Sequence, residues 1–281
     1  MIVQDCVNPI TERASKVKPT DYSKDGWAIV ECIETGMVFL ANPPNYSTLQ
    51  TDFPWEQTSE LEAQRRKIER PMRSKVSQLA KRVRLKVGRS QKVAIESVQL
   101  LAGMPKVEQF VVVDVGCGDA QNGLNVARLA QTKDLVVKPV GLEISVQLAK
   151  ESRARLKPFA GEVICAPAIE GLASMADESV DLLTLISFLE HEVQPAPLLR
   201  MCREKLKPTG RILLKVPNFD SINRKVFGPS WCGFRYPDHV NYFSAATLKI
   251  LVERCGLEIK RSTLLDRFTT NDNMWAVIGP A

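Results

Sequence analysis

The sequence has no run of eighteen apolar residues, so it predicts no membrane-spanning helix. Its first sixteen residues also lack the apolar stretch of a secretory signal, which favours a cytoplasmic location. The seven cysteines are odd in number and irregularly spaced, and we expect them to be free thiols. With 281 residues, 44% of them hydrophobic, the chain is long enough for one large core and a smaller appended unit.

The first sixty residues are short of metal ligands. They contain a strand–turn–strand pattern, with apolar residues at 27–32 and 37–40 on either side of a Thr-Gly turn. Cys6 and Cys32 each stand without a neighbouring cysteine, and neither histidine of the chain lies nearby. A structural zinc site requires four such ligands. We therefore expect residues 1–60 to form a small β hairpin unit held by packing, and we expect no metal.

Residues 64–92 are short of acids and of aromatics. They hold twelve Lys or Arg against one acid, a local charge of +11 in a chain whose net charge is +6. Apolar residues recur in this span every three or four positions, which predicts a basic helical linker over 61–105. Such a helix is either a solvated linker or a docking surface for an anionic substrate or a membrane-headgroup layer. Nucleic acid is disfavoured, because no aromatic side chain interleaves the cations to stack on bases.

The middle of the chain contains a strand, a glycine turn, a helix, a second strand and an acid, in that order. The first strand ends near Asp114, and the turn holds Gly116, Cys117 and Gly118. The second strand delivers Glu143 at its end. Glycines let the backbone approach a ligand, and an acid in this place accepts hydrogen bonds from ribose hydroxyls. The pattern predicts a site for a cofactor that contains adenosine.

The spacing of the glycines indicates which cofactor binds. A dinucleotide site would place its third glycine at Gln121, so the pyrophosphate pattern fails. The carboxylate of Asp114 would repel pyrophosphate but suits an ammonium or a sulfonium group. This D-x-G-x-G resembles the first motif of the class I S-adenosylmethionine-dependent methyltransferases, with Ala120 at the place of the usual third glycine.

Later segments resemble the same superfamily in the same order. The first is an acidic turn and apolar run at 177–186, followed by Leu-Glu-His. The second is the Lys-Pro-Thr-Gly turn at 207–210, followed by a strand at 211–216. The resemblance implies an α/β fold with a doubly wound, mostly parallel seven-stranded sheet whose C-terminal strand is antiparallel, formed by residues 106–281. It implies S-adenosylmethionine as cofactor. The residues that it places around the cofactor are Asp114, Gly116, Cys117, Gly118, Glu143, Ala168, Ile169 and Ser187.

The substrate side rests on the only two histidines of the chain, His191 and His239. His239 lies in an aromatic segment at about 219–243 that resembles the W…P-x-H…F-S loop of the superfamily. Because ligands bind beyond the carboxyl ends of the strands, we expect this segment to be a lid. His239 is then a candidate base, with Trp231, Tyr236 and His191 near the acceptor. The competing interpretation of both histidines is structural.

Taken together, these features predict a methyltransferase that acts on a small-molecule or an anionic or lipid-linked acceptor, by O- or N-methylation. One alternative is a catalytically silent protein of the same fold that serves as a binding partner or scaffold. A nicotinamide-dependent enzyme is disfavoured by the glycine spacing and by the antiparallel last strand. The sequence predicts no oligomeric state.

Overall fold

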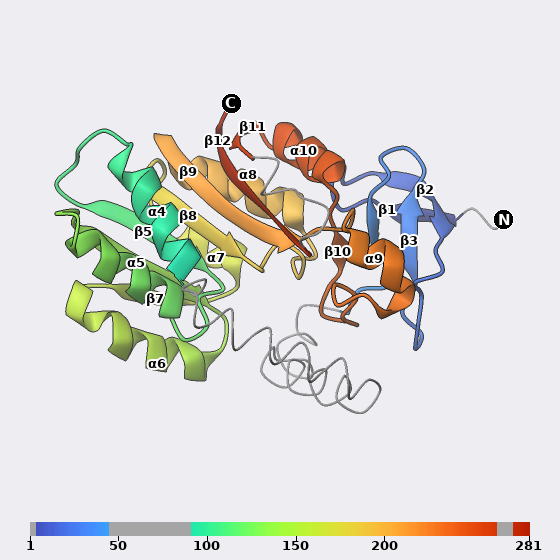
Figure 1. Cartoon of the computed structure of the whole chain (residues 1–281), viewed down its shortest axis with the longest axis horizontal. Coiled ribbons are helices and arrows are strands. Elements are labelled where there is room, and N and C mark those ends of the chain that lie inside the picture. The colour runs from blue at the N-terminus through green and yellow to red at the C-terminus, as the bar shows by residue number, and fades with distance from the viewer. Residues whose placement is uncertain (1–3, 45–90, 263–271) are drawn as a thin grey trace.

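The computed structural model describes residues 4–44, 91–262 and 272–281, which form two sheets (Figure 1). The strands of the large sheet are β5 (Phe110–Val115), β6 (Val137–Glu143), β7 (Glu162–Cys165), β8 (Val180–Ile186), β9 (Leu206–Pro217), β11 (Leu257–Arg261) and β12 (Asn273–Pro280). Their order is β11-β12-β9-β8-β5-β6-β7, and β12 pairs antiparallel with both of its neighbours. The seven-stranded, mostly parallel sheet predicted from the sequence is confirmed.

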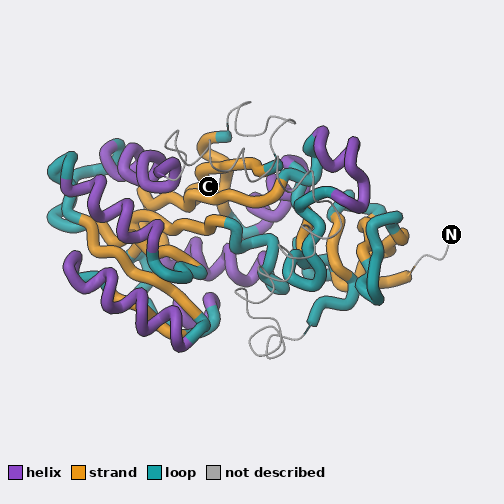
Figure 2. The backbone as a smooth tube through the Cα atoms, turned by 60° about the horizontal axis from the view of Figure 1, so that its bottom comes forward, coloured by secondary structure: helices purple, strands orange, loops and turns teal. Residues whose placement is uncertain are grey.

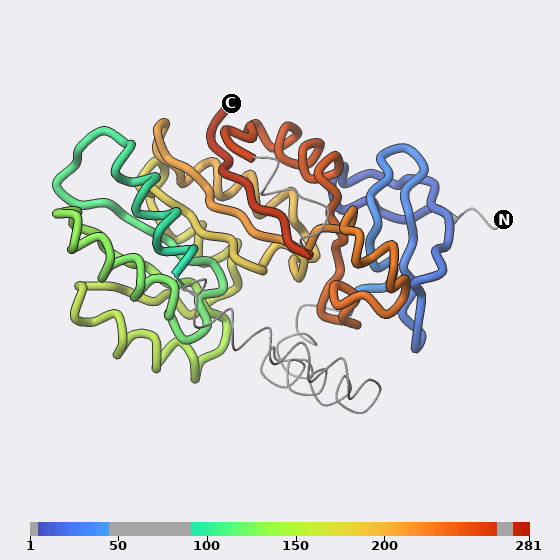
Figure 3. The backbone as a smooth tube through the Cα atoms, in the orientation of Figure 1, coloured from blue at the N-terminus to red at the C-terminus, as the bar shows by residue number. Residues whose placement is uncertain are grey.

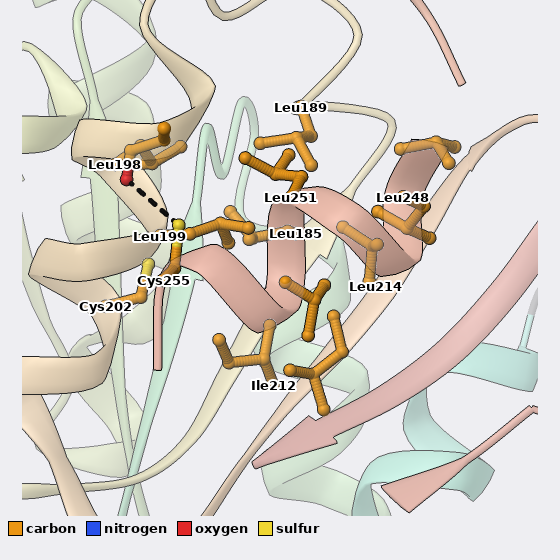
Figure 4. Close-up of a cluster of buried hydrophobic side chains, with 14 of the residues drawn as sticks. Leu185, Leu189, Leu198, Leu199, Cys202, Ile212, Leu214, Leu248, Leu251 and Cys255 are labelled. Carbon is orange, nitrogen blue, oxygen red and sulfur yellow. Dashed lines mark hydrogen bonds between the residues drawn. The ribbon is translucent and has the colours of Figure 1, made fainter. Parts of the chain in front are cut away.

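Helices cover both faces of this sheet (Figure 2). They are α4 (Lys92–Ala102), α5 (Gln121–Gln131), α6 (Val146–Leu156), α7 (Ala168–Ala173), α8 (Pro195–Lys205) and α10 (Ala245–Arg254). On one face, α4 and α5 bury side chains with Leu182 and Leu213. On the other, α7, α8 and α10 pack with Leu183 and Leu214. Figure 4 shows Leu199 of α8 and Leu251 of α10 in the same cluster as Leu214 of β9. Since neighbouring strand residues face opposite layers, both kinds of position must be apolar, which explains the continuous apolar runs.

Local signals set the helix boundaries. The side chain of Ser145 accepts a hydrogen bond from the amide of Leu148 and so caps the start of α6. Ser244 and Thr247 form a reciprocal cap at the start of α10. The turn predicted at 207–210 is instead a bulge within β9, because the pairing with β8 shifts register between Val180 and Leu182.

The small sheet is antiparallel, and its strands are β1 (Gln4–Val7), β2 (Ala14–Pro19), β3 (Ile29–Cys32), β4 (Val38–Leu40) and β10 (Asn241–Tyr242), in that order. The predicted hairpin is the β3–β4 pair, closed by Gly36 in a left-handed conformation. No feature of the sequence predicted that β10 joins this sheet from a segment two hundred residues away. Most of the basic span 64–92, and the boundary predicted at residue 60, lie outside the described residues.

None of the helices in the described ranges combines the length and the apolar character needed to cross a membrane.

Candidate active site

The glycine turn lies at the carboxyl end of β5, where a parallel sheet places its ligands. Gly116 and Gly118 have φ values of +69° and +54°, which glycine adopts without strain. Gly116 has a second requirement, because a Cβ there would lie 2.5 Å from the Phe188 ring. The loop after β8 therefore lies directly against the glycine turn.

Glu143 connects the turn to the end of β6. Its Oε2 accepts a hydrogen bond of 2.8 Å from the amide of Gly118, and its Oε1 accepts one of 2.8 Å from the amide of Ser145. The hydroxyl of Ser152 on α6 donates to the carbonyl of Gly118 at 2.6 Å. Each carboxylate oxygen keeps lone pairs for a further donor. The sequence-predicted pair of Gly118 and Glu143 is thus in contact.

Asp114 is 4% exposed, and its Oδ1 accepts a hydrogen bond from the hydroxyl of Thr184 on β8. Its Oδ2 is buried and accepts none from the described residues. Burial raises the pKa of Asp114 to about 6, against the opposing effect of the Thr184 hydrogen bond. A buried carboxylate of this kind is stabilised by a cationic group placed beside it.

Two further residues of the turn are inward-facing. The Cys117 thiol fills the space left by Gly141, since a Cβ there would lie 2.5 Å from its sulfur. Burial raises the pKa of that thiol to about 12, so Cys117 remains protonated and offers a ligand only its backbone. Ala120 has a φ of +58°, which is the backbone conformation that favours glycine at this position.

The remaining predicted cofactor residues lie at the same edge of the sheet. Ala168 and Ile169 begin α7 directly after β7, and Ile169 is half-buried. Ser187 follows β8 with a φ of +56°. Its hydroxyl accepts a hydrogen bond of 2.9 Å from the Lys215 ammonium, which fixes the start of the loop that leads to Glu190.

The segment at 219–243 packs against the small sheet (Figure 3). Trp231 is 2% exposed, and its indole N–H donates to Asp272 at 2.7 Å. Tyr236 stacks on Phe234 and donates its hydroxyl to the carbonyl of Tyr22 at 2.5 Å. The structure therefore places Trp231 and Tyr236 in an aromatic cluster that joins the two sheets. The role of the segment as a lid stays a prediction.

The two histidines meet although they are 48 positions apart. Their rings lie 4.6 Å apart between centroids in an edge-to-face arrangement, and a ligand atom of Glu190 lies within 4.8 Å of both. Glu190 is 1% exposed and was not among the residues predicted from the sequence. The only signal for it was the Leu-Glu-His that follows β8, from which His191 alone was predicted as a site residue.

Burial controls the ionisation of this cluster. It raises the pKa of Glu190 to about 7, although Lys215 and Arg235 favour the charged form. It lowers the pKa of His191 to about 4, with the positive charge of Arg235 acting in the same direction. The His191 ring is therefore neutral at physiological pH. The cluster combines the neutral His191 ring and the His239 ring with one carboxyl group, a set that can accept a proton or bind a cation.

Comparison with known proteins adds independent information. A model of the methyltransferase domain family matches residues 64–262. Over 131 residues the chain is 31% identical to the ubiquinone biosynthesis O-methyltransferase of Idiomarina loihiensis, covering 46% of this chain and 49% of that protein. The corresponding protein of Xanthomonas euvesicatoria is 29% identical over 108 residues, covering 38% of this chain and 43% of that protein. The chain thus spans about half the length of these curated relatives.

Solved structures support the same fold. A methyltransferase from Clostridium acetobutylicum superimposes with a TM-score of 0.54 at 9% identity, covering 74% of this chain and 98% of that one. The CcbJ methyltransferase of Streptomyces caelestis superimposes with a TM-score of 0.52 at 14% identity, covering 69% and 96%. At such identities the likeness concerns the fold alone.

Proposed function

We propose that this chain, which belongs to the methyltransferase domain family, is an S-adenosylmethionine-dependent methyltransferase that methylates an oxygen or nitrogen atom of a small-molecule or an anionic or lipid-linked acceptor. When bound, S-adenosylmethionine supplies a methyl group on a positively charged sulfur. The chain's own residues then hold the cofactor at the end of β5 and β6 and orient the acceptor beside it.

We assign the cofactor side to residues that fit its chemical groups. Glu143 accepts hydrogen bonds from the ribose hydroxyls. Its carboxylate oxygens use for this the lone pairs that are not already occupied by the amides of Gly118 and Ser145. Asp114 faces a cationic group with its buried Oδ2, which lacks a hydrogen-bond partner among the described residues. Ile169 contacts the adenine, and no carboxylate precedes it in the Ala-Pro-Ala stretch after β7.

The observation that carries the acceptor side is the meeting of Glu190, His191 and His239 at the loop that follows β8. The loop that bears Glu190 and His191 packs on Gly116 through Phe188. His239 removes the acceptor's proton or orients the acceptor, with a rate contribution of roughly 10²–10⁴-fold where proton removal is part of the reaction. Positioning beside the methyl group supplies the rest of the rate enhancement.

An oxygen acceptor is the first to test, since the curated relatives are named O-methyltransferases. The basic span 64–92 offers a second feature of the acceptor, because a charge of +11 favours an anionic molecule or surface. Most of that span lies outside the described residues, so this part of the proposal rests on the sequence.

The experiment uses methyl-labelled S-adenosylmethionine, the purified chain and a small-molecule extract. We expect label to enter an extract fraction, and partition between water and organic solvent then separates polar from lipid-linked products. The Glu143→Ala variant serves as the control for transfer that depends on the cofactor site. Cofactor binding without any transfer, in extracts of several sources, would favour the silent scaffold instead.

A further inference from the structure

We propose that Glu190, His191 and His239 form a binding site for one divalent transition-metal ion of the zinc type, where the loop after β8 meets the segment before β10. Two imidazole nitrogens and one carboxylate oxygen are a recurrent ligand set for such ions, and they leave coordination positions open for a further oxygen. This proposal replaces the expectation of no metal, which considered only Cys6 and Cys32.

The distances fit a site that closes around an ion. The three ligand atoms lie within 4.8 Å of one another. Ligands bound at roughly 2.1 Å to one ion are about 3.0–3.4 Å apart in octahedral or tetrahedral geometry. The largest separation therefore shortens by about 1.5 Å when an ion binds, which side-chain rotations of Glu190 and the histidines can supply.

Hydrogen bonds orient both rings. Nδ1 of His191 lies 2.9 Å from the carbonyl oxygen of Asp238, and Nδ1 of His239 lies 2.8 Å from that of Gly233. A carbonyl oxygen only accepts, so Nδ1 carries the proton in each ring. A ring that binds a metal ion with its Nδ1 protonated does so through the lone pair of Nε2. Metal-binding histidines are oriented in this way by a backbone carbonyl on the other nitrogen.

The carboxyl group of Glu190 needs a partner. Glu190 is only 1% exposed, and its buried Oε2 accepts no hydrogen bond from the described residues. A carboxylate oxygen that is buried without a partner destabilises the fold. The two nearby cations already have other contacts, since Lys215 donates to Ser187 and Arg235 pairs with Asp238 at 3.0 Å. An ion between the rings and Glu190 would satisfy that oxygen.

The two loops that carry the ligands are joined by the backbone. The carbonyl of Glu190 accepts hydrogen bonds from the amides of Val240 and Asn241. The Asn241 side chain donates to the carbonyls of Leu189 and Glu192, at 3.2 and 2.6 Å. Together these bonds hold the loop after β8 against the segment before β10, so the three ligands are brought together before any ion binds.

The role of the ion rests on the proposed function. An ion beside the acceptor lowers the pKa of its hydroxyl group, and His239 then acts by orienting the acceptor through the ion. The hydroxyl oxygen forms the new bond to the methyl carbon, the carbon–sulfur bond breaks with its electron pair going to sulfur, and the hydroxyl proton passes to solvent. Nitrogen ligands favour Zn²⁺ or Co²⁺ over Mg²⁺ and Ca²⁺, which prefer oxygen.

The test is metal binding by the full chain, freed of metal by a chelator and without cofactor or acceptor. Co²⁺ is titrated while its visible absorption is recorded, and Zn²⁺ and Mg²⁺ are titrated by calorimetry. We expect one Co²⁺ or Zn²⁺ per chain and at least tenfold weaker binding of Mg²⁺. Glu190→Gln and His191→Gln should each weaken Co²⁺ binding by about 10–100-fold or more. Removing a residue that only hydrogen-bonds to a metal ligand already weakens binding by that factor.

Two controls keep the result decisive. Cys165→Ser and Cys232→Ser remove the exposed thiols, the competing soft ligands, and should leave Co²⁺ binding unchanged. The wild-type chain has only two histidines, so nitrogen NMR of labelled imidazoles shows two rings, both of which must shift at Nε2 when Zn²⁺ is added. The NMR measurement needs no variant and so does not depend on the variants folding.

Absence of binding, binding that needs the thiols, or imidazole signals that do not move would each overturn the site. A chain that binds Co²⁺ through the two rings but transfers no methyl group would retain the metal site and refute the proposed function. Methyl transfer that is unchanged in excess chelator, with no ion bound, would retain the proposed function and refute the metal site.

Discussion

Replacing Glu143 by alanine removes the acceptor that we assign to both ribose hydroxyls. A hydrogen bond to a charged group contributes about 1.5–3 kcal/mol, so two would contribute roughly 3–6 kcal/mol if neither were replaced by water. Because water enters the space left by the side chain, the measurable loss is smaller. We therefore expect S-adenosylmethionine affinity to fall at least tenfold, which corresponds to about 1.4 kcal/mol.

The assay is calorimetric titration of the cofactor, accompanied by thermal unfolding without ligand. The second measurement is needed because Glu143 also accepts from two backbone amides, so its loss loosens the glycine turn. Glu162→Ala is the matched control, since it removes the same charge from the exposed start of β7, where Glu162 pairs with Lys138. Equal affinity of the wild type and Glu143→Ala would refute the assignment of the ribose site.

Four further results follow from the cofactor side. Burial raises the pKa of Asp114 to about 6, and a bound cation favours its carboxylate, so the affinity for the cofactor should fall as the pH drops below 6. Calorimetry in two buffers should detect proton release on cofactor binding, which Asp114→Asn abolishes. Without cofactor, Asp114 contributes fully to stability below its unfolded pKa of 3.8 and loses that contribution as the pH rises through about 6, so the same variant should flatten the stability curve there. Gly116→Ala should lower the free energy of unfolding, measured by chemical denaturation, by roughly 2–5 kcal/mol, because alanine is strained in the left-handed region and would clash with the Phe188 ring. Gly36→Ala, with open space around it, should lower it by only about 1–2 kcal/mol. Equal losses would contradict this. Ile169→Ala should weaken cofactor binding roughly five- to thirtyfold through lost apolar contact, and a bound structure with a carboxylate on the adenine amine would contradict the assignment.

Much of the large sheet could be predicted because its signals are local. The runs in β5 and β8 are apolar without alternation, since both faces are covered, and Ser145 and Ser244 mark helix starts with their own side chains. The pairing of Gly118 with Glu143 was predictable for a related reason. Parallel neighbours end at the same edge of the sheet, so a turn after one strand meets an acid at the end of the next.

The acceptor side was less predictable because its contacts are non-local. The pairing of β10 with β4 involves two residues that no periodicity marks. Trp231 was expected near the acceptor from its place in the aromatic segment at 219–243, but its burial depends on Phe219 and Phe234, which only the fold brings to it. Glu190 is adjacent to His191 in sequence, yet its approach to His239 depends on backbone bonds between two loops. Such contacts follow from topology and not from composition.

The central claim, that methyl transfer takes place beside the two histidines, is tested most directly by His239→Ala. Cofactor affinity and labelled methyl transfer to the identified acceptor are measured on the same preparation of the variant and the wild type. We predict cofactor affinity within about twofold of the wild type and turnover lower by roughly 10²–10⁴-fold. Unchanged turnover would contradict the account and leave His239 a structural residue, bonded to the carbonyl of Gly233.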